Sequence, residues 1–464
     1  MRIKEKNPHN RYEIDMCNGP ILTKLLRFTL PLMLSGVLQL VFNAADIIVV
    51  GKNCGDISLG AVGSNTALIN LMVNLFMGIA VGVNVMVAKF YGAGKRGEVE
   101  ETVHTAMVLS LIGGIVLTIV GEMFAKQLLI LMQTPEKNLK LAVVYLRIYF
   151  LGMPAMMIYN FGSAILRAVG DTKRPLLFLA IAGIVNVGLN LLLVIVFRLD
   201  VAGVGIATVV SQIISAILVV ICLMKNTGVV RLNIRKLAVK RDKVIGILRV
   251  GIPAGLQGTV FALSNVVIQS SINLFGEIVV AGNSAAASVE GFVYMAMNAF
   301  YHTTLSFVSQ NYGAGKLKRI PKVLLAGEFC VIITGLALGW LAVLFSSQLL
   351  GIYTDSSAAI EAGKIRMLII CGTYALCGVM EVLTGAIRGM GYAIIPMVVS
   401  MIGACGLRLV WIATIFRIEK YHVLKTVLVS YPITWTITAC THLICFLIMY
   451  RMRTKRIKQY SGIS

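Results

Sequence analysis

Long apolar stretches dominate this sequence and constrain its fold more than any other feature. Twelve stretches reach about 18 residues or more, the length that a helix needs to cross a bilayer. They are centred near residues 37, 73, 111, 152, 186, 212, 257, 293, 334, 373, 404 and 437. Because they are too long for barrel strands and lack strict polar alternation, the sequence predicts an all-α membrane protein with 12 transmembrane helices.

The composition agrees, since 58% of the residues are hydrophobic and only 13% are charged. Soluble domains carry about 25% charged residues. The first apolar run is too long for a signal-peptide core and lacks a small-residue cleavage site, so we interpret it as the first span. The nine cysteines mostly fall inside spans without zinc-binding spacing, which predicts apolar packing residues and no structural metal.

The net charge of +22 is best explained by membrane orientation. Most of the 42 Lys and Arg residues lie in the termini and in every second loop. The positive-inside rule then places both termini in the cytoplasm, with the lipid bilayer as the partner surface and no nucleic acid. Only Arg147 and Arg408 are expected inside spans among the basic residues.

The chain also repeats itself at half its length. The pentapeptide YGAGK occurs at residues 91–95 and 312–316, an offset of 221 residues, and the flanking motifs LLRFTLP and ILRVGIP recur at nearly the same offset. This predicts an N-lobe (1–224), a basic cytoplasmic linker (225–243) and a C-lobe (244–464). Each lobe has six spans, an even number, so the lobes should be related by a pseudo-twofold axis along the membrane normal.

The repeated pentapeptide does not fit a nucleotide site. A phosphate-binding loop needs GxxxxGK followed by Ser or Thr, whereas Arg96 and Leu317 follow the two lysines. We interpret the glycines as tight turns at span ends, with the lysines at the lipid headgroups. Without ATP, transport must draw on an ion gradient, which requires polar groups inside the membrane.

The first half offers one carboxylate well inside a span, Asp46. Asn186 and Asn190 share one face of span 5 at i, i+4, and Thr208 adds a hydroxyl in span 6. Such oxygens suit a hard cation, so Asp46 is our candidate metal ligand for Na⁺, or else a proton carrier. The alternatives are that Asp46 faces outer-leaflet water and that the two amides only bond a neighbouring helix.

The second half offers Glu381, Glu290, Gln257 and Arg408 as candidate substrate or proton-binding residues inside spans. Glu381 precedes Arg388 by two helical turns, so these two residues form either a static pair or part of a functional site. An unpaired carboxylate there would favour a cationic, amphipathic substrate. Asp46 has no counterpart in this half, because Val267 or Ile268 occupies its place.

These features together resemble the multidrug and toxin extrusion (MATE) transporters, of the bacterial DinF-like and NorM-like branch, over roughly residues 20–450. The resemblance rests on the spacing of Pro31 and Asp46, on YGAGK, and on LRAVGDTKRP with its counterpart IRGMGYAIIP. It implies two six-helix lobes around a V-shaped central cavity. It also implies export of organic cations in exchange for inward Na⁺ or H⁺, with no cofactor and a monomeric protein.

The resemblance assigns the coupling cation to Asp46, Asn186 and Thr208, and to the position of Asn190, which is an aspartate in several relatives. The NorM-like branch also has an aspartate in span 10 where this chain has Cys377. Two other functions are alternatives to a MATE transporter. A lipid-linked oligosaccharide flippase of the same superfamily would need several interior basic residues. A membrane-embedded enzyme would need a catalytic motif such as HExxH, which is absent.

Overall fold

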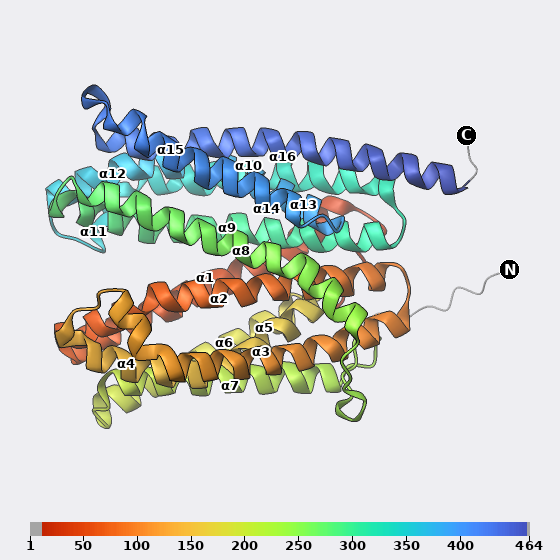
Figure 1. Cartoon of the computed structure of the whole chain (residues 1–464), viewed down its shortest axis with the longest axis horizontal. Coiled ribbons are helices and arrows are strands. Elements are labelled where there is room, and N and C mark those ends of the chain that lie inside the picture. The colour runs from red at the N-terminus through yellow and green to blue at the C-terminus, as the bar shows by residue number, and fades with distance from the viewer. Residues whose placement is uncertain (1–11, 462–464) are drawn as a thin grey trace. The chain divides into compact units, whose positions relative to one another are not determined.

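The computed structural model describes residues 12–461 (Figure 1). These residues form helices and short connections, and no strand occurs among them. The helices up to the linker are α1 (Ile21–Asn53), α2 (Gly55–Gly92), α3 (Arg96–Leu131), α4 (Glu136–Leu151), α5 (Met153–Ala168), α6 (Lys173–Asn190), the π-helix η1 (Leu191–Val196) and α7 (Asp200–Met224).

The linker contains the short 3₁₀ helix η2 (Ile234–Lys236). After it come α8 (Arg241–Asn273), α9 (Glu277–Gly313), η3 (Leu317–Arg319), α10 (Ile320–Leu344), α11 (Ser346–Gly351), α12 (Ser357–Ile370), η4 (Cys371–Thr373), α13 (Tyr374–Gly389), α14 (Ile394–Ser400), the π-helix η5 (Met401–Gly406), α15 (Leu407–Ala413), η6 (Ile415–Arg417), η7 (Glu419–Tyr421) and α16 (Leu424–Ser461).

The predicted spans are confirmed by length and composition. Within residues 12–461, eleven helices are long and apolar enough to cross a membrane, and a bent pair brings the number to twelve. That pair is α4 and α5, which meet at Gly152 with a bend of 47°. Pro154 follows at the start of α5, where its missing N–H costs no helical hydrogen bond. The predicted fourth span is therefore a broken helix.

The chain divides into two compact units. Unit 1 comprises residues 1–15 and 34–255, and unit 2 comprises 16–33 and 256–464. The boundaries fall within α1 and α8, whereas the lobes predicted from the sequence meet at the linker. The lobe bounds and the axis between the lobes stay predictions.

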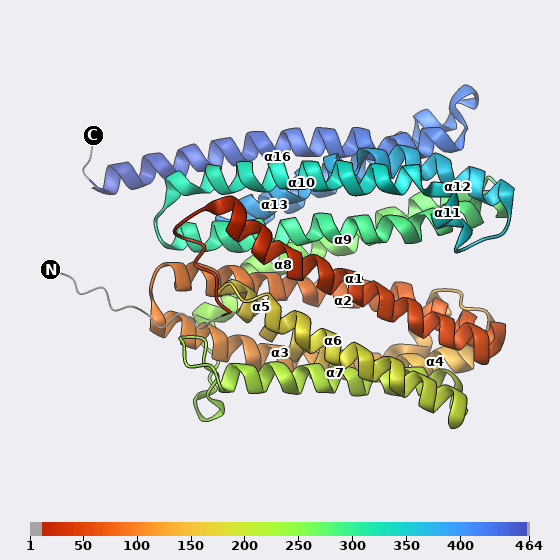
Figure 2. The same cartoon turned by 180° about the vertical axis from the view of Figure 1, so that it is seen from behind.

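Unit 1 packs around α5, which contacts α2, α3 and α7, while α6 runs beside α7 (Figure 2). Small residues permit this packing. A side chain on Gly114 of α3 would collide with the backbone of Pro154, and Gly121 leaves the space that the ring of Phe150 fills. In unit 2, α13 takes the corresponding central place against α9, α10 and α16.

The two YGAGK segments form equivalent turns, which confirms the tight turns predicted there, whereas the place of the lysines at the lipid headgroups stays a prediction. Gly94 and Gly315 have φ of 69° and 68°, a left-handed conformation that glycine adopts without a steric penalty. Lys95 N–H then reaches the Phe90 carbonyl at 3.1 Å, and Lys316 N–H reaches the Asn311 carbonyl at 2.9 Å. The Lys316 ammonium group donates to the Cys17 carbonyl at 3.0 Å within unit 2.

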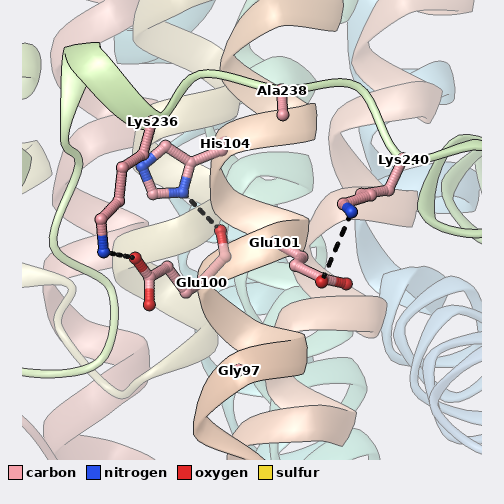
Figure 3. A pocket seen from close by; sticks show the side chains of 7 residues that line it. All are labelled: Gly97, Glu100, Glu101, His104, Lys236, Ala238 and Lys240. Atoms are coloured by element: carbon pink, nitrogen blue, oxygen red, sulfur yellow. Dashed lines mark hydrogen bonds and ion pairs between the residues drawn. The ribbon is translucent and has the colours of Figure 1, made fainter.

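The basic linker lies against the start of α3 (Figure 3). His104 of α3 holds the linker through one ring nitrogen: Nε2 lies 3.0 Å from the Asn233 N–H, while Nδ1 lies 2.7 Å from the Glu100 carbonyl of its own helix. A carbonyl only accepts and an N–H only donates, so Nδ1 carries the proton and Nε2 accepts. Lys236 adds an ion pair to the Glu100 carboxylate at 3.2 Å.

The linker ends on a cluster of acidic side chains. Lys243 is only 3% exposed and pairs with Glu98, with Glu101 at 3.4 Å and with Asp242 at 2.6 Å. These three carboxylates lie close enough together to suit a cation. The Lys243 ammonium group already supplies the positive charge, so this cluster attaches the linker to unit 1.

Replacing His104 with phenylalanine is expected to loosen the linker. The change removes the hydrogen bond to the exposed Asn233 N–H, a net loss of about 0.5–1.5 kcal/mol because that N–H can bond to water instead. We expect trypsin to cleave the linker roughly two- to tenfold faster, because about 1.4 kcal/mol corresponds to a factor of ten in opening. Glu100→Gln is the matched control: it removes only the exposed ion pair and should change cleavage less than twofold. Equal cleavage of wild type and His104→Phe contradicts this account.

Candidate functional site

The structure joins three of the four residues that were predicted to form the N-terminal cation site. The Asn190 side-chain amide of α6 donates a hydrogen bond to the Asp46 carboxylate of α1, and it lies 3.3 Å from the Asn186 side-chain oxygen. Asn190 is fully buried, and its own Oδ1 has no hydrogen-bond partner among the described residues. A carboxylate and two side-chain amides, one of which has an oxygen without a partner among the described residues, therefore lie together inside unit 1.

A close approach of α1 and α6 positions this site. A Cβ atom on Gly183 would overlap the ring of Phe42, so the glycine allows the two helices to touch. Asp46 lies one turn after Phe42, whereas Asn186 and Asn190 lie one and two turns after Gly183. The contact at Gly183 thus sets the distance between the Asp46 carboxylate and the two amides.

Thr208 does not join the hydrogen bonds of this group in the described structure. Its hydroxyl donates to the Val204 carbonyl of its own helix, α7, at 3.0 Å. The sequence prediction missed Tyr145 and Tyr149 of α4, which lie within electrostatic range of Asp46. Their i, i+4 spacing on one helix face was a usable signal, but only the packing of α4 brings that face toward α1.

The oxygen atoms of this group suit a hard monovalent cation or a proton. Carboxylate and amide oxygens are the ligands that Na⁺ prefers, and a carboxylate inside the membrane can also carry a proton. The Asn190 Oδ1 atom has no partner among the described residues, so it can coordinate a cation or accept a hydrogen bond from a proton donor. Because Asn190 stands where a second carboxylate would be expected from the resemblance, the site carries a single negative charge.

The candidate residues of the second half form two separate groups within unit 2. In the first, Glu290 of α9 pairs with Arg366 of α12 at 2.6 Å and accepts a hydrogen bond from the Tyr374 hydroxyl at 3.3 Å. Arg366 also donates to the Asn283 side-chain oxygen at 2.8 Å. Glu290 is thus engaged in an ion pair, and Arg366 is a buried basic residue that the sequence prediction missed.

Glu290 and Arg366 are expected to depend on each other for stability. Removing one partner of a buried pair leaves an uncompensated charge and costs about 3–5 kcal/mol, so Glu290→Gln and Arg366→Gln should each lower the unfolding temperature of the purified protein strongly. The double variant should be more stable than either single variant. Additive losses would show that the two residues act independently.

In the second group, Arg388 of α13 donates to the Gln257 side-chain oxygen at 2.6 Å and to the Tyr301 hydroxyl at 2.7 Å. Glu381 lies within electrostatic range of Arg388, yet it forms no ion pair or hydrogen bond within the described part of the chain. The predicted static pair of Glu381 and Arg388 is therefore not a direct contact. Gln257 takes the place beside the guanidinium group.

The predicted set of interior basic residues was incomplete. Arg147 is half-exposed and lies 3.6 Å from Glu122, whereas Arg366, Arg388 and Arg408 are all buried in unit 2. Arg408 is 1% exposed and stacks on the Tyr431 ring, with the guanidinium carbon 3.8 Å from the ring centroid. Charge inside unit 2 is therefore more basic than the sequence indicated.

Comparison with known proteins decides the family. The MatE family model matches residues 31–192 and 253–414, which together cover more than half of the chain and repeat the internal symmetry. The chain belongs to the MatE family. The resemblance drawn from the motifs is thereby confirmed, and so is the all-helical fold with up to twelve candidate spans.

Individual MatE relatives match nearly the whole chain. The probable multidrug resistance protein YoeA of Bacillus subtilis is 26% identical over 89% of this chain and 90% of its own length. An FAD transporter of Shewanella oneidensis is 23% identical over 90% of this chain and 93% of its own. A MOP superfamily transporter structure from Pyrococcus furiosus is 22% identical, covers 96% of this chain and 98% of its own, and has a TM-score of 0.87.

These relatives establish a coarse function for the chain. The family is one of multi-pass membrane transporters for small molecules, so this chain is a MatE transporter. The names do not favour the oligosaccharide flippase considered from the sequence. They also describe transporters and not enzymes.

Proposed function

We propose that this MatE protein is a secondary antiporter that exports small organic molecules in exchange for inward Na⁺ or H⁺. The observation that supports this most is the convergence of Asp46, Asn186 and Asn190, with the free Asn190 Oδ1 beside the carboxylate. Cation binding there would neutralise Asp46 and change the relative stability of two transport states. The protein would act as a monomer in the inner membrane, with both termini in the cytoplasm.

The preferred substrate is an organic cation. Glu381, a carboxylate in unit 2 without an ion pair among the described residues, supports this choice because a cationic molecule can satisfy it. The second candidate is an anionic substrate. It is supported by the three buried arginines of unit 2 and by the relative named an FAD transporter, since FAD carries phosphate groups.

Transport in proteoliposomes tests both parts of the proposal. We would measure ethidium and FAD movement under a Na⁺ gradient alone and under a pH gradient alone. One gradient should drive substrate movement and the other should not, and ethidium should be preferred. Substrate movement that is equally fast in the absence of both gradients would refute antiport. Movement of FAD but not of ethidium would select the anionic substrate.

A further inference from the structure

Arg408 is a buried positive charge without a negative partner. Its side chain is 1% exposed, yet it forms no ion pair within the described residues. One guanidinium nitrogen donates to the Thr434 hydroxyl at 3.3 Å, a long hydrogen bond, and Nε has no acceptor. The face of Tyr431 covers the group on one side. The planar cation is therefore held in place, but its charge is not neutralised.

Such a charge is costly to bury. Burying an unpaired ion in a protein interior is strongly unfavourable, and cation–π contact with one tyrosine offsets only part of that cost. Arg366 avoids this cost because Glu290 lies 2.6 Å away. Arg408 lies near the same tyrosine as Arg366, whose guanidinium carbon is 5.9 Å from the Tyr431 centroid, but Arg408 has no such carboxylate.

The neighbours of Arg408 add a second unsatisfied group. Cys405 lies close to both Arg408 and Ser264, and apart from this weakly bonding sulfur the buried Ser264 hydroxyl of α8 has no hydrogen-bond partner among the described residues. A guanidinium N–H and a hydroxyl can both donate to an anion. Arg408 also lies two residues after the end of the π-helix η5, an irregular segment of a kind often found at functional sites.

The internal repeat relates the position of Arg408 to a residue of the cation site in unit 1. The two segments matched by the family model have equal length, and aligning them end to end places Asn186 opposite Arg408. The Arg167 and Arg388 motifs align with an offset one residue shorter, so the correspondence holds within one position. Where unit 1 has the Asn186 amide, which accepts a hydrogen bond from Asn190, unit 2 has a cation.

We propose that unit 2 contains an anion-binding site centred on Arg408, with Ser264 as a second donor and Tyr431 as one wall. The ligand is a small anionic group, either a free inorganic ion or the anionic group of a larger molecule. The site is independent of the proposed coupling cation, because it uses no residue of the Asp46 group.

Thermal unfolding of the purified full-length protein in phosphatidylcholine nanodiscs tests this site. Sodium chloride and sodium phosphate would each replace sodium gluconate at constant Na⁺, which removes cation effects and acidic lipids. The unfolding temperature of wild type should rise saturably with at least one of these anions. A response to chloride alone identifies a free halide, and a response to phosphate identifies a phosphoryl group as the ligand.

Arg408→Gln should abolish this rise, and in gluconate it should be at least as stable as wild type, because it removes an uncompensated charge. Arg417→Gln, an exposed arginine at the end of the same span, is the matched control and should respond like wild type. If Arg408→Gln fails to fold, Arg408→Lys keeps the charge and should need several-fold more anion for half-saturation. No shift in wild type, the same shift in Arg408→Gln, or an unchanged half-saturation in Arg408→Lys overturns the proposal.

Discussion

Replacing Asp46 with asparagine is expected to lower gradient-driven transport in proteoliposomes on the order of tenfold or more. The variant keeps the shape of the side chain and an oxygen that accepts from Asn190, so the contact of α1 with α6 can persist. It removes the only negative charge of the Asp46 group. A cation then gains little by binding, and the gradient no longer shifts the equilibrium between transport states.

Two controls separate this effect from general damage. The unfolding temperature of Asp46→Asn should stay close to wild type, since no hydrogen bond is lost. Glu136→Gln removes an exposed carboxylate at the start of α4 in the same unit and should transport normally. Wild-type rates in Asp46→Asn under both a Na⁺ and a pH gradient would exclude the carboxylate from coupling.

The fold was largely predictable because membrane spans are encoded locally. Each long apolar stretch forms a helix regardless of how it packs against the other helices, so the spans could be predicted from hydrophobicity alone. The break in the fourth span was missed. Gly152 and Pro154 mark it in the sequence, but its bend depends on how α4 and α5 pack.

Contacts at i, i+4 on one helix were predicted better than a contact seven residues apart or the partner that Arg388 finds on another helix. The i, i+4 spacing correctly placed Asn186 and Asn190 together, and the carboxylate of Asp46 met them. Glu381 and Arg388 are seven residues apart, which is about 10 Å along a helix and too far for direct contact. The actual partner of Arg388, Gln257, comes from another helix and could not be inferred from spacing.

Arg366 is a second residue whose partners could not be inferred from the sequence. It precedes the centre of its predicted span by seven residues, a position near the end of a span of about 18 residues. Burial follows from Glu290 and Asn283 of α9, which lie about 80 positions earlier in the chain. Charge inside a membrane protein depends on such tertiary pairs, so the sequence underestimates it.

Gly183→Leu is expected to reduce transport on the order of tenfold without touching any ligand. A side chain there must displace the Phe42 ring, and overpacking of this kind costs about 1–3 kcal/mol. The displaced α1 would carry Asp46 away from Asn186 and Asn190. Both the unfolding temperature and gradient-driven transport of the purified variant should fall.

A compensating change distinguishes this geometric effect from a general intolerance of α6 to leucine. Phe42→Ala empties the space that the introduced leucine side chain would need, so the double variant should regain transport and stability relative to Gly183→Leu. Gly188→Leu, on the same helix where a Cβ meets nothing within 4 Å, should behave like wild type. If the double variant stays as impaired as Gly183→Leu, the contact of Gly183 with Phe42 does not set the position of Asp46, and the arrangement of the cation site must depend on other contacts of α1.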